Sequence, residues 1–284
     1  MTFTTRNHLF IEHEQFTLES GSAVHKWVIG SPRGLLLLQH GFGEYAERYV
    51  DSHSAFVPRL NALGIEVWAI DLQGHGSSPG NGSTIDVKSA VDDHIQVRRQ
   101  ARASGLPLFL FGHSLGGLIT AGSTAHDTPG ISGVILSSPA FAAPETPKLV
   151  EGTLELLAWI APSMSLPKPR TQASKLVHGA ERIKSIEDDP KLLRGQISCM
   201  SATTVLRMSR FIWSTLDQWR VPTLVLHGTS DVAARFEISE RFVGMIASLD
   251  KLLHLDGGGY HELLCDSHSE QVLEVIIQWL NAHI

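Results

Sequence analysis

The fold is decided by the stretch Leu108-Phe109-Leu110-Phe111-Gly112-His113-Ser114-Leu115-Gly116-Gly117. Its first four residues form an apolar run too short for a buried helix, so they predict a strand, and residues 118–125 predict a helix directly after it. The pattern G-x-S-x-G lies between the two, where it is typical of a tight strand-to-helix turn that exposes a nucleophilic serine, here Ser114. Side chains at positions 112 and 116 would collide with neighbouring backbone, which explains the glycine at both.

The partners of this serine are expected at the ends of later strands. A serine hydroxyl is a poor nucleophile at neutral pH and needs an adjacent base. On this kind of turn the acid follows the serine in the chain, and the histidine follows the acid. The apolar run Thr223–Leu226 leads into Asp231, and the run Lys251–Leu255 leads into His261. We therefore expect a triad of Ser114, Asp231 and His261, in which Asp231 orients the imidazole that takes the serine proton.

A second carboxylate, Asp256, also stands at a strand end and is the alternative acid. Aspartate in a turn readily makes local hydrogen bonds to the backbone, so we expect Asp256 to cap the glycine turn that follows it. The sequence therefore favours Asp231 as the acid of the triad and leaves Asp256 as the alternative.

An acyl intermediate also needs donors for its oxyanion. One is expected to be the backbone N–H of Leu115, the residue after the nucleophile. The second should come from the loop after the strand Leu35–Gln39, which reads His40-Gly41-Phe42-Gly43-Glu44. We assign it to the backbone N–H of Phe42, because the flanking glycines let the main chain approach a substrate. The alternative is an ordinary strand-to-helix turn.

Short apolar runs alternate with longer amphipathic stretches along most of the chain. Such runs, apolar on both faces and separated by helices, predict an α/β fold with a mostly parallel sheet flanked by helices. The first thirty residues instead alternate around Glu19-Ser20-Gly21-Ser22, which predicts a β-hairpin. The strands predicted after the hairpin are Leu35–Gln39, Ile65–Ile70, Leu108–Phe111, Gly133–Leu136, Thr223–Leu226 and Lys251–Leu255.

One interval, from Pro139 to Pro222, contains no clear strand. An insertion of this size after the sixth strand predicts a helical cap at residues 141–218, between core parts at 1–140 and 219–284. Two interpretations of its first helical segment stay open: an ordinary helix that buries its apolar face in the core, or a lid whose apolar face meets the substrate. The apolar residues concerned are Leu149, Val150, Leu154, Leu157 and Trp159.

The composition is that of a globular protein with a large core, since 43% of the 284 residues are hydrophobic and 18% are charged. The formal net charge is −6, and the densest basic cluster is only Arg98, Arg99 and Arg102. Phosphate binding needs a concentrated positive face, so nucleic acid is excluded as the main partner. The N-terminus lacks the apolar core of a signal peptide, and no run approaches the ~20 apolar residues of a membrane span. We expect a cytoplasmic protein, with contact at a membrane surface left open.

The cysteines and histidines give no sign of a cross-linked or metal-dependent protein. Cys199 and Cys265 do not make a disulfide framework; two reduced thiols are the preferred interpretation and a pair the alternative. The sequence His261-Glu262-Leu263-Leu264 is followed by cysteine, so the zinc pattern H-E-x-x-H fails. We expect no metal and no cofactor. The loop histidines are expected to be structural and hydrogen-bonded; they are His40, His75 and His113.

Several segments together resemble one family, that of monoacylglycerol lipases and related lysophospholipase-like hydrolases. The likeness runs from about residue 10 to the C-terminus. Residues 40–49 resemble the family's HGxGEHxxRY, residues 71–80 are similar to its DxxGHGxSxG, and residues 112–117 match its GHSxGG. Further likenesses are LSSPA at 136–140, a DPLxxxG-like element at 188–195, the acid segment at 226–231 and the histidine segment at 259–262.

The resemblance implies an α/β-hydrolase fold with a helical cap and a long apolar acyl pocket. It also implies the triad and oxyanion hole already named, from Ser114, Asp231, His261, Phe42 and Leu115. The implied activity is serine carboxylic ester hydrolysis of monoacylglycerols or similar single-chain lipid esters through an acyl-enzyme. The alternatives are a lysophospholipase or a general short- or medium-chain carboxylesterase and, more remotely, a non-catalytic binding protein on this fold.

Two departures from the family pattern bear on the substrate. Tyr45 stands where the family usually has histidine, and Val232-Ala233-Ala234-Arg235 follows the acid where the family more often has a valine- or cysteine-containing turn. We expect both at the mouth of the substrate site, so the headgroup preference stays open. A lipid substrate also suggests transient contact of the cap with a membrane surface, while the sequence leaves the oligomeric state undetermined.

Overall fold

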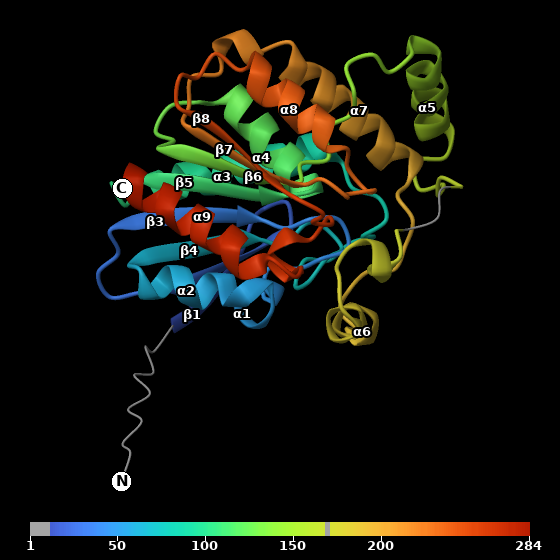
Figure 1. The fold of residues 1–284 in the computed structure, drawn as a ribbon. Helices are drawn as coiled ribbons and strands as arrows, with labels where there is room; N and C mark the ends of the chain where they lie inside the picture. The colour runs from blue at the N-terminus through green and yellow to red at the C-terminus, as the bar shows by residue number, and fades with distance from the viewer. Residues whose placement is uncertain (1–11, 168–170) are drawn as a thin grey trace.

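The computed structural model describes residues 12–167 and 171–284, in which eight strands form one sheet of order β1-β2-β4-β3-β5-β6-β7-β8 (Figure 1). The first two strands form the predicted hairpin, and β2 also pairs antiparallel with β4. The remaining pairs are parallel, so the predicted mostly parallel sheet is confirmed. The strands are β1 (Glu12–Thr17), β2 (Ala23–Val28), β3 (Gly34–Gln39), β4 (Ile65–Ile70), β5 (Leu108–His113), β6 (Gly133–Ser137), β7 (Thr223–Gly228) and β8 (Lys251–Asp256).

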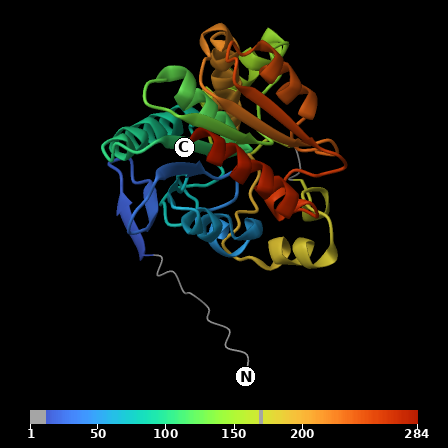
Figure 2. The same cartoon turned by 60° about the vertical axis from the view of Figure 1, so that its left-hand side comes forward.

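Helices cover both faces of this sheet (Figures 1 and 2). The α-helices are α1 (Arg48–Asp51), α2 (Phe56–Ala62), α3 (Val87–Arg102), α4 (Leu115–His126), α5 (Lys148–Ile160), α6 (Ala180–Asp188), α7 (Cys199–Trp213), α8 (Phe236–Met245) and α9 (Ser269–His283). Short 3₁₀ turns are η1 (His53–Ala55), η2 (Ala173–Lys175), η3 (Leu216–Gln218) and η4 (Leu263–Cys265).

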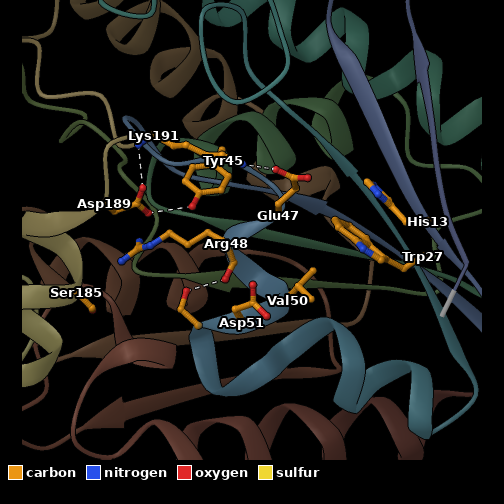
Figure 3. A pocket seen from close by; sticks show the side chains of 11 residues that line it. His13, Trp27, Tyr45, Glu47, Arg48, Val50, Asp51, Ser185, Asp189 and Lys191 are labelled. Atoms are coloured by element: carbon orange, nitrogen blue, oxygen red, sulfur yellow. Dashed lines mark hydrogen bonds and ion pairs between the residues drawn. The ribbon is translucent and has the colours of Figure 1, made fainter. Parts of the chain in front are cut away.

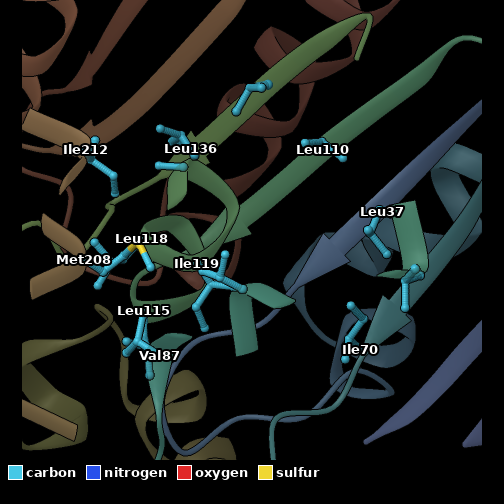
Figure 4. Packing of buried hydrophobic residues seen from close by; sticks show 14 of the residues in the cluster. Leu37, Ile70, Val87, Leu110, Leu115, Leu118, Ile119, Leu136, Met208 and Ile212 are labelled. Carbon is cyan, nitrogen blue, oxygen red and sulfur yellow. The ribbon is translucent and has the colours of Figure 1, made fainter. Parts of the chain in front are cut away.

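Alternation along the central strands divides the core in two. Leu35 and Leu37 of β3 pack with apolar residues of α3, α4, α7 and α8, whereas Leu36 and Leu38 pack with α1, α2 and α9. Figure 4 shows the first of these layers, where Leu118 and Ile119 of α4 lie among residues of the sheet and α7. Each fully buried side chain of this size contributes about 1.5–3 kcal/mol, so the two layers hold the sheet rigidly between them.

The edge strands differ from the prediction of strands covered on both sides. Every residue of β3, β5, β6 and β7 is buried, as a run apolar on both faces predicts. Lys251 and Leu252 of β8 are exposed, because β8 is the last strand and has a neighbour on one side only. The prediction that the strands are covered on both faces is therefore correct for the central strands and wrong for the start of β8.

The register of the parallel strands brings the loops that follow them to one edge of the sheet. Gln39 at the end of β3 pairs with Gly112, and His113 pairs with Ser137. The ends of β7 and β8 are also level, since Gly228 pairs with Asp256. Loops that follow these strands therefore meet at the carboxyl edge, where ligands bind in open α/β sheets.

The segment between β6 and β7 is helical, as predicted, and contains α5, α6 and α7. Helix α7 enters the core through Met208 and Ile212. No residue of the fully described helix α5 is buried, and the side chains of Leu149 and Trp159 are each 82% exposed. The interpretation that this helix buries its apolar face in the core is therefore wrong. The division of the chain at residues 140/141 and 218/219 stays a prediction.

Three further expectations concern the ends and the thiols. Cys199 and Cys265 are both free, which agrees with the preferred interpretation of reduced thiols. No helix in the described part of the chain combines the length and apolar character that crossing a membrane requires. The N-terminal expectation of no signal peptide falls largely on residues 1–11, which lie outside the described residues.

Candidate active site

Ser114 occupies a strained turn between β5 and α4. Its backbone angles are φ 52° and ψ −117°, a conformation that costs of order 1–3 kcal/mol for a residue with a side chain. The turn is held on both sides, because the N–H of Ser114 donates to the carbonyl of Ser137 and the N–H of Ala140 donates to the carbonyl of Ser114. Strain that is kept in place by surrounding structure is common where a side chain must be presented for chemistry.

The two glycines of the turn are required by close backbone contacts. A Cβ at Gly112 would lie 2.4 Å from the carbonyl oxygen of Gly116, and a Cβ at Gly116 would lie 2.2 Å from that of Gln39. Both distances are far shorter than any van der Waals contact. The expected collision of side chains with neighbouring backbone is confirmed.

His261 and Asp231 reach Ser114 from the loops after β8 and β7. The Nε2 atom of His261 lies 2.8 Å from the Oγ of Ser114, and its Nδ1 lies 2.6 Å from the Oδ2 of Asp231. Because the carboxylate accepts from Nδ1–H, the lone pair of Nε2 faces the serine hydroxyl, which donates to it. Residues separated by as many as 147 positions in the chain thus form one continuous hydrogen-bonded row.

The surroundings of Asp231 favour its charged form. Its Oδ1 accepts from the backbone N–H groups of Ala233 and Ala234, at 2.7 and 2.9 Å, and His227 contacts its Oδ2 at 3.2 Å. Burial alone would raise the pKa of Asp231, but the charge of His261 and hydrogen bonds from both histidines hold this pKa well below its ordinary value.

The charge on Asp231 in turn acts on His261. Burial alone would lower the pKa of His261, but the charge and hydrogen bond of Asp231 raise it above the ordinary 6.5. An imidazole with a raised pKa is a stronger base, which is what removal of a serine proton requires.

Asp256, the rival acid, is engaged elsewhere. Its Oδ1 lies 2.9 Å from the Nδ1 of His268. The turn that follows is held through the backbone of Asp256, whose carbonyl accepts from the N–H groups of Thr229 and Gly259. The expected side-chain cap is therefore replaced by a carboxylate–histidine pair, and Asp231 is the acid that contacts His261.

The loop that follows β3 lies against the serine turn. The N–H of Gly41 donates to the carboxylate of Glu44, and the N–H of Gly43 donates to the Nε2 of His75. These bonds fix the residues on either side of Phe42 without using the Phe42 N–H. Gly41 and Phe42 line the same cavity as Ser114, where a main-chain donor can approach an oxyanion.

The three loop histidines are hydrogen-bonded, as expected. His40 accepts from the N–H of Leu72, His75 accepts from Gly43, and the Nδ1 of His113 contacts the carbonyl of Ser137. Burial lowers the pKa values of His75 and His113 to about 4, so both are neutral near pH 7.

A buried ionic network, which the sequence analysis did not identify, supports both loops. Arg48 pairs with Glu44 and, at 3.0 Å, with Glu262 beside the histidine, while His53 lies 3.3 Å from Glu44. Burial alone would raise the pKa of Glu44, but its contact with His53 and the charge of Arg48 keep this pKa well below its ordinary value. The i, i+4 spacing of Glu44 and Arg48 was the available signal, although such pairs usually lie on the surface.

The cavity beside Ser114 has a volume of about 140 Å³. Its lining includes Thr171 and Leu176, which also line an adjoining cavity of about 220 Å³ beneath α6. Helix α5 contributes no residue to either described lining. Of the two departures from the family pattern, Ala233 lines the cavity, whereas Tyr45 lies in a separate groove and donates to Asp189.

Comparison with known proteins identifies the family. Residues 30–268 match the family described as Serine aminopeptidase, S33. The chain belongs to this family. Within it, the chain is 29% identical to a monoacylglycerol lipase of Mycolicibacterium smegmatis, over 89% of this chain and 90% of that protein. It is 26% identical to a caffeoylshikimate esterase of Arabidopsis thaliana, over 90% of this chain and 80% of that protein.

A solved structure agrees with these relatives. The crystal structure of the Paleococcus ferrophilus monoacylglycerol lipase has a TM-score of 0.80 and 30% sequence identity, covering 95% of this chain and all of that one. The protein is therefore an α/β-hydrolase and a carboxylic ester hydrolase similar to monoacylglycerol lipases, as the sequence resemblance predicts.

Proposed function

We propose that this enzyme hydrolyses monoacylglycerols, or similar single-chain lipid esters, with Ser114 as nucleophile, His261 as base and Asp231 as the acid that orients it. The observation that carries the proposal is the row of hydrogen bonds from Asp231 through His261 to Ser114. The monoacylglycerol lipases among its relatives support the substrate class. Because all three side chains are present, the enzyme is favoured over a binding protein on the same fold.

The reaction follows from the geometry. Ser114 Oγ attacks the ester carbonyl while His261 Nε2 takes its proton, and Asp231 stabilises the imidazolium. The oxyanion of the tetrahedral intermediate accepts from the backbone N–H groups of Phe42 and Leu115. His261 then gives the proton to the leaving glycerol oxygen, and the acyl group stays on Ser114. Water repeats the sequence, with His261 as base again, and releases the fatty acid.

The acyl chain, in this proposal, passes from Ser114 beneath the segment that contains Leu176. This segment is tied to the histidine loop, because the N–H of Glu262 donates to the carbonyl of Leu176. Beyond it, an apolar cluster continues toward α6. The cavity of about 140 Å³ is small against the 300–1,000 Å³ usual for ligand sites, so a long chain needs both adjoining cavities joined by movement of Leu176.

The cap, which we assign to residues 141–218, is proposed to touch membranes. Helix α5 and the residues just after it carry a group of exposed apolar side chains that the core does not use. They are Leu149, Val150, Leu156, Trp159, Ile160 and Met164. Exposed apolar surface of this kind is typical of interaction sites, and a lipid surface is where monoacylglycerols reside. We propose a cytoplasmic enzyme that binds membranes transiently through α5.

A panel of esters tests the substrate. Rates with monoacylglycerols from butyrate to palmitate are compared with those of lysophosphatidylcholine, triacylglycerols and acetate esters. Each buried methylene contributes about 0.8 kcal/mol, so kcat/KM should rise with chain length until the site is full. Triacylglycerols should be poor substrates. A maximum at acetate or butyrate would favour the general carboxylesterase, and a preference for lysophosphatidylcholine would favour the lysophospholipase.

A further inference from the structure

Three potential metal ligands meet near the edge of the sheet that is formed by the hairpin. His13 lies on β1, His25 on β2 and Glu47 just before α1. One donor atom of each lies within 4.8 Å of the donor atoms of the other two. These residues are far apart in the chain and match no metal-binding pattern, so the sequence analysis expected no metal.

The orientation of His25 is fixed by a carboxylate behind it. The buried His25 places Nε2 2.9 Å from the Oδ2 of Asp71. Backbone N–H groups donate to both oxygens of Asp71, that of Ser77 to Oδ2 and that of Ala46 to Oδ1. Because Asp71 is thus an acceptor, Nε2 of His25 carries the hydrogen and the lone pair of Nδ1 faces His13. A carboxylate that fixes the tautomer of a ligating histidine in this way is the usual support of protein metal sites.

The same carboxylate connects two of the three ligand-bearing segments, those of His25 and Glu47. Ala46, which donates to Asp71, is the residue directly before Glu47. His13 is positioned by stacking, since its ring lies 5.2 Å from those of His25 and Trp27, at interplanar angles of 2° and 12°. Contacts within the protein therefore hold the three segments around one point.

The separation of the two imidazoles suits a single ion. The Nε2 of His13 lies 3.0 Å from the Nδ1 of His25. With metal–nitrogen bonds of 2.0–2.1 Å, two nitrogens on one ion lie about 2.9 Å apart at a right angle and about 3.3 Å apart in a tetrahedron. The distance between the two nitrogens thus needs to change by only a few tenths of an ångström. His13 has to carry its hydrogen on Nδ1 instead of Nε2. Because His13 is exposed, water can accept a hydrogen bond from Nδ1.

Two of the three residues, His13 and Glu47, line a groove of about 540 Å³ (Figure 3). In the figure His13 and Trp27 stand on one side of the groove, Asp189 and Lys191 on the other, and Glu47 between them. Lys191 contacts one oxygen of Glu47 at 2.9 Å, but this pair is 59% and 40% exposed and therefore weak. Glu47 can turn to an ion without a large loss.

We propose that His13, His25 and Glu47 form a binding site for one divalent transition-metal ion, with Zn²⁺ as the first candidate. Two imidazoles and a carboxylate are donors that suit Zn²⁺, and three protein ligands leave one position for water or a ligand in the groove. The site shares no lining residue with the cavity beside Ser114, so it is distinct from the ester hydrolase site. A bound ion would join the exposed strand β1 to the segment before α1.

The test is a titration of the full-length, EDTA-treated protein with ZnCl₂ by calorimetry and thermal unfolding. We expect one Zn²⁺ per chain and, at 100 times Kd, a rise in Tm of about 5 °C. His13→Ala and Glu47→Gln should each weaken binding at least about 10-fold, because each removes a ligand from a partly exposed position that the core does not need. Their Tm values without zinc check that the variants fold.

Two controls separate this site from others. His254→Ala removes a histidine from β8, at the opposite edge of the sheet, and should bind Zn²⁺ like the wild type. Cys265→Ser alters a second group of potential ligands, His53, Glu262 and Cys265, and should also leave binding unchanged. The proposal is overturned if no saturable binding occurs up to about 0.1 mM free Zn²⁺. It is equally overturned if His13→Ala binds like the wild type, or if Cys265→Ser abolishes binding.

Discussion

Asp231→Asn tests the proposed role of the acid, because the hydrogen bonds around Asp231 determine how the new amide must lie. The Oδ1 position accepts from the backbone N–H groups of Ala233 and Ala234, so the amide oxygen of Asn must occupy it. The amide NH₂ then takes the Oδ2 position, 2.6 Å from the Nδ1 of His261. Since the amide donates there, Nδ1 becomes an acceptor and the hydrogen of neutral His261 moves to Nε2.

That tautomer cannot accept the proton of Ser114. We expect kcat to fall by about three to four orders of magnitude, or about 4–5.5 kcal/mol in activation free energy, with little change in KM. The assay is steady-state hydrolysis of a medium-chain monoacylglycerol, with the Tm of the variant measured to confirm folding.

Asp256→Asn is the matched control, because Asp256 is also a buried carboxylate paired with a histidine, His268. It should retain activity within about threefold, since it does not contact His261. If Asp231→Asn stayed within tenfold of the wild type, or if the two variants exchanged their effects, the assignment of the acid would be wrong.

Three further predictions follow from the site and the cap. The log of kcat/KM should fall as the pH decreases through the raised pKa of His261, because the base must be neutral, so the midpoint should lie above 6.5; a midpoint below 6.5 would contradict this. Leu176→Trp should lower kcat/KM for palmitate monoacylglycerol about 15–60-fold, because the acyl chain loses two to three methylene contacts. The same variant should change kcat/KM for the butyrate ester little, and the control Leu154→Ser should change kcat/KM little for either ester. Equal losses on both esters would argue against the acyl path. Replacing Leu149 and Trp159 with Ser should reduce sedimentation with phosphatidylcholine–monoolein vesicles several-fold without changing hydrolysis of a water-soluble ester. Unchanged sedimentation would remove α5 from the membrane contact.

The sheet and the serine turn could be predicted because their signals are local. A run such as Ile65–Ile70 predicts a strand from its own residues, and the structure gives the same bounds. The glycines around Ser114 mark a backbone contact that no other residue tolerates. The chain order of serine, acid and histidine was sufficient to predict that Asp231 and His261 lie at the same edge of the sheet as Ser114.

The features that were missed depend on contacts between distant segments. Helical spacing in residues 148–160 predicts an apolar face, but only the structure shows that none of these residues is buried and that Leu149 and Trp159 are exposed. The ionic network of Glu44, Arg48 and Glu262 joins two loops that the sequence separates by more than two hundred residues. Likewise, Tyr45 follows residues 40–44, the proposed source of an oxyanion donor, yet its side chain lies in the separate groove near Asp189.

The most direct test of the account is to locate the acyl-accepting residue. A fluorophosphonate probe should add once to the wild-type protein, and peptide mass spectrometry should place it on Ser114. Ser114→Ala should be unlabelled and should lose nearly all ester hydrolysis while keeping the Tm within a few degrees, because the glycines mainly shape the turn. Labelling of another serine in this variant, with hydrolysis intact, would contradict the proposed triad.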